Sequence, residues 1–282
     1  MVAAQLSEFD PLVLKELEDK SRGKLAELNK SGRVIGEEIF KILDQTALLI
    51  QYPIDDDELC GFVCKKDNRI FAFVNSASPL EKQIFAAAHE LYHIWYDEAS
   101  LLAGEMVKSD TLETLDINGV ETKANRFAAM FLVQKQLIHA ELGNLAVDKA
   151  EQLELSHIVR LMDVFGVPYK TIVRRLFEIS FIGREQCEML LMIPDKEETT
   201  GVRLMQKRLQ IGERWQHRTQ TIRFGNLVDQ TLRAHEKKSI PLERLRYLLA
   251  MARKTPAEFG IETENSGPND AELQRILNET ED

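Results

Sequence analysis

The feature that most constrains this chain is a predicted helix with two histidines one turn apart. Residues 78–81 read Ser-Pro-Leu-Glu, the pattern of a helix start: serine at the N-cap, proline at the first helical position and glutamate three residues after the cap. We expect the helix to run to about Tyr96, and residues 89–93 within it read His-Glu-Leu-Tyr-His. Because positions i and i+4 share one face of a helix, His89 and His93 are within reach of the same ion.

The residue between these histidines, Glu90, gives the pair a chemical role. Neutral imidazoles bind zinc well, and a bound metal lowers the pKa of water to about 7. A neighbouring carboxylate then takes the proton from that water and delivers it to a leaving amine. The alternative is a solvated helix face that carries His, Glu and His without a metal. The position inside a well-started helix favours the metal site, with Glu90 as the general base.

A catalytic zinc site needs a third protein ligand. The pattern with glycine and histidine just downstream is excluded, because Tyr96 and Ala99 stand at those positions. Glu121 is favoured, since Ala124 and Ala128 lie on the same side of its helix and allow close packing against the histidine helix. The alternative is that Glu121 only stabilises the start of its helix, through the helix dipole. The acidic residues between the two helices are rival ligands: Asp97, Glu98, Glu105, Asp110, Glu113 and Asp116.

Short apolar runs before this helix predict a small sheet. Residues 46–52 form such a run, which is closed by Pro53. Residues 58–64 and 69–75 flank the polar segment 65–68, the pattern of a hairpin, although the turn lacks an Asn-Gly pair. Helices are expected at about residues 11–29, 35–43 and 121–141.

Four segments together carry a family resemblance: residues 71–75, 78–79, 88–93 and 121–129. They are similar to the ImmA/IrrE family of metallopeptidases, and the resemblance extends from about residue 35 to residue 183. One position departs from the family pattern, which usually has glycine before the second histidine, where this chain has Tyr92. The departure removes no ligand but changes the wall of the cleft.

The resemblance implies a zincin-type α+β fold: a small twisted sheet, an active-site helix and a second helix that provides the glutamate. It implies His89, His93 and Glu121 as ligands of Zn²⁺, with Mn²⁺ as the alternative metal, and Glu90 as general base. Family members typically cleave a helix-turn-helix repressor, often encoded nearby, and so induce mobile-element, stress or defence genes. We therefore expect a metallo-endopeptidase that cuts such a repressor. The alternative is a non-proteolytic binding regulator of a toxin–antitoxin or phage-defence locus.

Four further residues are candidates for substrate contact. Val74 and Asn75 end a strand that we expect at the sheet edge, where substrate adds as another strand. An ordinary half-buried strand is the equal alternative. Tyr92 or His139 is a candidate for stabilising a tetrahedral oxyanion, although a structural or surface role is favoured for each.

Residues 154–180 have the length and the turn glycine of a helix-turn-helix. Lys170, Arg174 and Arg175 fall on its second helix, which reads the major groove in DNA-binding proteins. The net charge of the chain is −10, which argues against a protein that coats nucleic acid. We favour a helical unit that supports the peptidase, and direct DNA binding is the less favoured reading.

The region after residue 200 changes its charge twice. Residues 201–260 hold 13 Lys and Arg against 5 Asp and Glu, with Trp215 and Phe224 interleaved, whereas residues 261–282 hold 1 against 7. The first part predicts a helical accessory module for substrate, inducer or dimer contacts, and the second an acidic tail. The predicted domains are residues 1–145, 146–193, 202–264 and 265–282, and the oligomeric state stays open.

Three further features of the sequence bear on the cellular compartment of the protein. No basic stretch followed by an apolar run opens the chain, so we expect no secretory signal. The longest apolar run, residues 128–133, is too short to span a membrane. Three cysteines give no paired framework and indicate a reducing compartment. The expected location is the cytoplasm.

Overall fold

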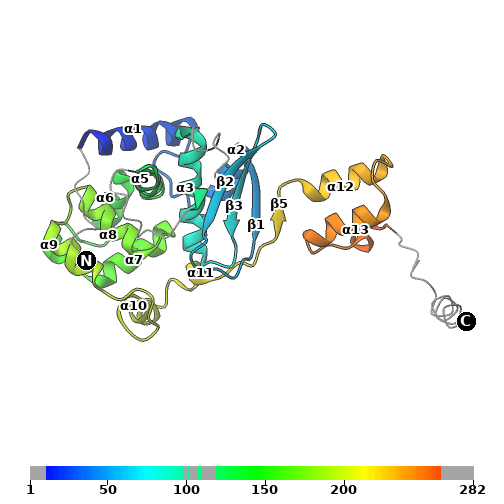
Figure 1. Cartoon of the computed structure of the whole chain (residues 1–282). Coiled ribbons are helices and arrows are strands. Elements are labelled where there is room, and N and C mark those ends of the chain that lie inside the picture. Colours follow the sequence, from blue (N-terminus) through cyan, green and yellow to red (C-terminus); the bar gives the residue numbers. More distant parts are fainter. Residues whose placement is uncertain (1–10, 98–100, 102–106, 109–118, 262–282) are drawn as a thin grey trace, which may run out of the picture. The chain divides into compact units, whose positions relative to one another are not determined.

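The computed structural model describes residues 11–97, 101, 107–108 and 119–261, and the chain forms two compact units. The N-terminal unit extends to Gly225, and the C-terminal unit begins at Asn226. The N-terminal unit combines one small mixed sheet with helices (Figure 1), which confirms the expected α+β class.

The sheet has the strand order β4-β2-β3-β1-β5. β1 and β3 pair in parallel, and the other neighbouring strands pair antiparallel. The edge strands β4 and β5 are short, whereas β3, which we expected at an edge, is central. The strands are β1 (Leu48–Tyr52), β2 (Gly61–Lys66), β3 (Arg69–Asn75), β4 (Val107–Lys108) and β5 (Arg223–Phe224).

β2 and β3 form the predicted hairpin. Lys66 pairs with Arg69, so the turn consists of Asp67 and Asn68. Both residues have positive φ, 49° and 59°, as a type I′ turn requires. Asp and Asn tolerate this conformation better than most side chains, so the pair serves where Asn-Gly is usual.

The histidine helix, α3 (Leu80–Tyr96), lies between the sheet and α5 (Val120–Leu132) (Figure 1). Because both sides of the helix are covered, all its residues from 83 to 93 are buried. α3 begins one residue later than expected, with Pro79 at the N-cap and no side-chain cap, so the predicted capping box does not form. α1 (Pro11–Glu27) packs on α5, and α2 (Glu38–Thr46) packs on α3 and β1.

The helix-turn-helix-like segment is part of the same core. Gly166 ends α7 with φ 64°, and a side chain there would meet the Trp215 ring at 2.8 Å. Most of α8 is buried, and Arg175 is 1% exposed, with hydrogen bonds to Val133 and Glu18. Arg175 therefore cannot read a DNA groove, because it is enclosed by the fold. The four helices here are α6 (Lys135–Asn144), α7 (Leu155–Phe165), α8 (Tyr169–Glu178) and α9 (Arg184–Leu191).

Residues 194–225, which we call the strap, complete the N-terminal unit. Arginines of the basic run form ion pairs with acidic residues far back in the chain: Arg214 with Glu37, Arg218 with Asp57 and Arg223 with Asp44. Trp215 is buried against α7, and β5 extends the sheet next to β1. The structure thus divides the chain at Gly225 instead of before residue 202, because the strap binds the earlier part of the chain. Its helices are α10 (Gly201–Leu209) and α11 (Glu213–Gln216).

The C-terminal unit contains α12 (Leu227–Glu236), α13 (Leu242–Met251) and a 3₁₀ turn (Pro256–Phe259). α12 and α13 pack together, and Leu245 and Leu249 are fully buried. The 3₁₀ turn begins with a capping box in which the Thr255 amide donates to Glu258. The predicted acidic tail, 265–282, lies outside the described residues. Within the described part of the chain, no helix is both long and apolar enough to cross a membrane.

Candidate metal centre

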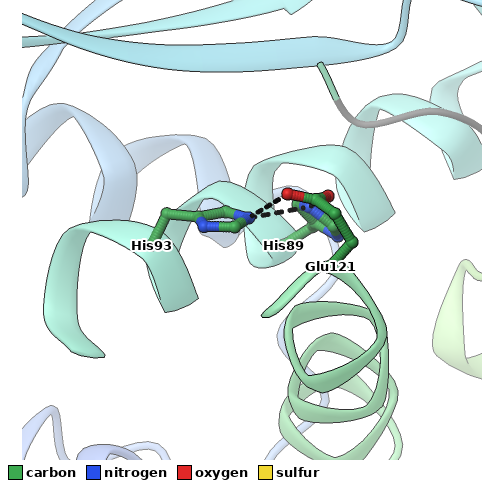
Figure 2. Close-up of side chains that lie close together, drawn as sticks. All are labelled: His89, His93 and Glu121. Atoms are coloured by element: carbon green, nitrogen blue, oxygen red, sulfur yellow. Dashed lines mark hydrogen bonds and ion pairs between the residues drawn. The ribbon is translucent and has the colours of Figure 1, made fainter. Parts of the chain in front are cut away.

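Two elements bring the predicted ligands together. His89 and His93 lie one turn apart on α3, and Glu121 lies in the first turn of α5, where it faces both (Figure 2). His89 Nε2 lies 3.1 Å from His93 Nε2 and 3.1 Å from Glu121 Oε2. His93 Nε2 lies 3.5 Å from Glu121 Oε1. Glu121 was favoured among the candidates for third ligand, and the structure places it at the histidine pair.

Two further side chains hold the imidazole rings. His93 Nδ1 donates to Asp97 Oδ2 at 3.0 Å, and His89 Nδ1 donates to Asn125 Oδ1 at 2.8 Å. When the protons are on both Nδ1 atoms, as metal binding requires, the lone pairs on both Nε2 atoms face Glu121. Such partners are typical of metal-ligating histidines, because they fix the tautomer and the ring orientation. Asp97, a rival third ligand in the sequence, thus acts through His93.

The donor set fits a divalent transition metal. Ligand atoms about 2.1 Å from a tetrahedral zinc ion lie about 3.4 Å from one another, close to the separations here. Three acceptor atoms converge on one point, and they repel one another unless a cation lies between them. Two imidazoles with one carboxylate suit zinc, and the carboxylate also suits manganese. His89, His93 and Glu121 could therefore hold a metal ion.

Burial lowers the pKa of both histidines, whereas the neighbouring negative charges raise it. Burial lowers the pKa of His93 below its ordinary value, and the neighbouring His89 lowers it further. Burial also lowers the pKa of His89, but the hydrogen bond with Glu121 and the charges of Glu90 and Glu121 outweigh it, so that this pKa is raised. The negative groups around His89 thus favour positive charge at the centre.

Glu90 lies on the sheet side of α3. Its side chain is fully buried, and Gly61 on β2 lies directly beside it. A Cβ atom at position 61 would come within 3.3 Å of Glu90 Oε1 and 2.8 Å of the Phe73 carbonyl oxygen. Only glycine leaves room there for both groups. Sequence reasoning missed Gly61, because nothing in the strand pattern marks a glycine that faces a helix 29 positions later.

Comparison with known proteins identifies the part of the chain that holds this centre. Residues 59–177 match the family model Peptidase_M78, described as the IrrE N-terminal-like domain. The match confirms the resemblance found in the sequence and includes all four residues of the centre, His89, Glu90, His93 and Glu121.

The comparison with solved structures gives a partial match. A Mycobacterium tuberculosis transcriptional regulator is 18% identical, with a TM-score of 0.39, over 57% of this chain and 46% of that chain. This chain therefore spans less than half the length of that protein. Among curated proteins, none matches.

Two predicted substrate contacts of the IrrE N-terminal-like domain are wrong. Val74 and Asn75 are fully buried, and β3 is already paired with β1 and β2, so no substrate strand can add there. The Asn75 side chain instead bonds the loop before β2, accepting from Ile54 and donating to Leu59. Asn75 is thus a structural residue that ties the loop to the end of the strand.

The other two candidates lie away from the ligand atoms. Tyr92 is buried among Tyr96, Phe127 and the edge of His93, and burial raises its pKa to about 12. It therefore packs α3 against α5. His139 is exposed on α6, and no contact among the described residues joins it to the centre. The remaining rival ligands, Glu98, Glu105, Asp110, Glu113 and Asp116, lie outside the described residues.

A cavity of about 670 Å³ opens beside His89. Its inner wall belongs to the IrrE N-terminal-like domain and includes Phe85, Asn125 and Met162. Its outer wall belongs to the strap, with Arg203 and Arg218. The strap lies beyond the matched residues, so the outer wall is built by a part of the chain that the family model does not describe.

Proposed function

We propose that this chain is a metallo-endopeptidase, in which His89, His93 and Glu121 hold Zn²⁺, with Mn²⁺ as the alternative. The observation that carries the proposal is the convergence of His89 Nε2, His93 Nε2 and the Glu121 carboxylate, whose ligand atoms lie within 4.8 Å of one another beside a buried glutamate. A divalent ion held there would polarise a peptide carbonyl and acidify water.

The protein's own groups supply the rest of the reaction. Glu90 takes a proton from the attacking water and delivers it to the amine that leaves when the C–N bond breaks. Asp97 and Asn125 keep the imidazole lone pairs aimed at one point, which lowers the reorganisation needed during the reaction. Gly61 leaves the space that Glu90 occupies.

We further propose limited, site-specific cleavage of a protein partner in the cytoplasm. The substrate class that fits the family is a helix-turn-helix repressor encoded nearby, whose loss induces stress, mobile-element or defence genes. The buried face of α8 supports a protein partner over DNA, because Arg175 has no access to a groove.

Metal content and cleavage test the proposal together. Elemental mass spectrometry of purified wild type is expected to give about one zinc or manganese per chain, and Glu121→Ala to lose most of it. Co-expression with the neighbouring repressor should shorten that repressor.

Glu90→Gln separates metal binding from chemistry. Because the glutamine cannot accept the proton, cleavage should fall by about 10²- to 10⁴-fold while the metal content stays that of wild type. Cleavage at the wild-type rate would disprove the role of Glu90. Absence of metal even after reconstitution would disprove the peptidase and leave a binding regulator.

A further inference from the structure

One face of α3 runs from the metal centre into the cavity. Glu81, Phe85 and His89 are spaced four residues apart, so they line the same face, and all three line the cavity. Eight helical residues span about 12 Å, which matches three to four residues of an extended peptide. A substrate held at the centre in an extended conformation therefore brings neighbouring side chains to Glu81.

Glu81 is a buried carboxylate at the far end of this face. It is 6% exposed, although acidic side chains are almost never buried without a close partner. Burial raises its pKa, and the neighbouring Gln216 side chain and the charge of Arg203 only partly oppose this. The nearest cation, Arg203, lies 3.9 Å from Glu81 Oε1, beyond hydrogen-bond distance.

Arg203 also has a partner on its own helix. Its Nη1 donates to Gln206 Oε1 at 3.1 Å on the same helix. A carboxylate offers about four acceptor positions, so Glu81 retains capacity on the side that faces the cavity. The lining includes the apolar side chains Phe85, Ala86 and Met162, together with exposed or half-buried charged residues of both signs. Apolar side chains beside a buried carboxylate suit a long aliphatic stem with a cationic head.

We propose that this cavity is a specificity subsite, which receives an arginine or lysine side chain of the substrate with Glu81 as the acceptor. The proposal deepens the proposed peptidase function. It rests on that function, because the bound side chain belongs to a substrate only if the chain is a peptidase. Because the strap closes the outer wall, the subsite belongs jointly to the IrrE N-terminal-like domain and to the sequence that follows it.

The test measures binding without hydrolysis. Full-length Glu90→Gln protein is titrated with Nα-acetyl-arginine N-methylamide and with the matching glutamate compound. The NMR signal of the Met162 ε-methyl group, assigned with Met162→Leu, reports occupancy because Met162 lines the cavity. The arginine compound should shift this signal saturably, and the glutamate compound should not.

Added variants separate the acceptor from overall charge. Adding Glu81→Gln should weaken binding of the arginine compound about tenfold or more, since a hydrogen bond to a charged partner is lost. Glu213→Gln removes the same charge from an exposed residue outside the cavity and should change nothing. Arg203→Gln should leave the binding intact or tighten it. Thermal melting shows whether each variant is folded.

Three outcomes would overturn the proposal: neither compound binds, the glutamate compound binds through Arg203, or Glu81→Gln binds as tightly as its parent. None of these outcomes depends on hydrolysis. An inactive wild type would therefore disprove the peptidase function, and the binding data would still show whether the cavity accepts the arginine side chain. If wild type is active, its digest of a peptide library should favour Arg or Lys at one fixed position. Glu81→Gln should lose that preference.

Discussion

Helix α3 and the strap are both rich in ionisable residues, yet they use charge in opposite ways. On α3 the groups are buried and their partners orient them: Asp97 holds His93, and Asn125 holds His89. On the strap the cations are largely exposed and pair with acidic residues of the surface, as Arg214 does with Glu37. Exposed pairs contribute little to stability, whereas buried groups lose a great deal when a partner is removed. The contrast teaches that burial, not charge density, decides how much a charged residue depends on its partners.

Arg175 gives the largest expected effect, because it is a buried charge outside the metal centre. It bonds the Val133 carbonyl, Glu18 and Glu178, and Glu178 also pairs with Arg126. Arg175→Met should lower the free energy of unfolding by about 3–5 kcal/mol, because the buried Glu178 carboxylate loses one of its charged partners. Urea denaturation measures this. A loss below about 1 kcal/mol would show that Arg175 behaves like a surface residue.

Gly61→Ala tests whether the space beside Glu90 matters for catalysis. The new methyl group would press on the Phe73 carbonyl and on Glu90, which must then move. Displacing a reacting group by about 1 Å costs up to about 10²-fold in rate, so kcat should fall by that order while metal content is retained. Unchanged kcat in folded Gly61→Ala protein would remove Gly61 from the positioning of Glu90.

Variants of Asn125 and Asp97 test whether the hydrogen bonds to the two imidazole rings matter for metal binding. Asp97→Ala and Asn125→Ala should each weaken metal affinity about 10- to 100-fold, because the imidazoles lose their fixed orientation. Competition with a chelating dye gives the affinities. Asn125→Asp keeps an oxygen acceptor for His89 and should recover most of the loss. Equal weakening by Asn125→Ala and Asn125→Asp would mean that the hydrogen bond is not the cause.

Arg214 gives the smallest expected effect and is the counterpart of Arg175. Its side chain is 67% exposed in the pair with Glu37. Arg214→Met should change the free energy of unfolding by less than about 1 kcal/mol, since solvent screens the pair. The same denaturation experiment applies. A loss as large as that of Arg175→Met would mean that the ion pairs, rather than Trp215 and β5, hold the strap in place.

Local patterns predicted a large part of this molecule. The helix with His89 and His93 and the hairpin of β2 and β3 each depend on residues a few positions apart. The small side chains Ala124 and Ala128 also favoured Glu121, which the structure places at the histidine pair, since close packing of two helices follows from side-chain size. Interactions of this range are encoded by spacing, so one sequence suffices to find them.

Features that join distant segments escaped the sequence. β3 became central because β1 pairs with it in parallel across the connecting residues 53–68, and so Val74 and Asn75 were misplaced at an edge. Gly61 and Asn125 were missed for the same reason, since their partners Glu90 and His89 lie on another element.

The sequence by itself determined which residues have metal-binding chemistry and which helices carry them. Only the tertiary structure decided that the three candidate ligand atoms converge, that Asp97 contacts His93 Nδ1, and that the strap lines the cavity at Glu81. The physical reason is that spacing along the chain fixes a face of one element. Which faces meet depends on the burial and packing of the whole unit.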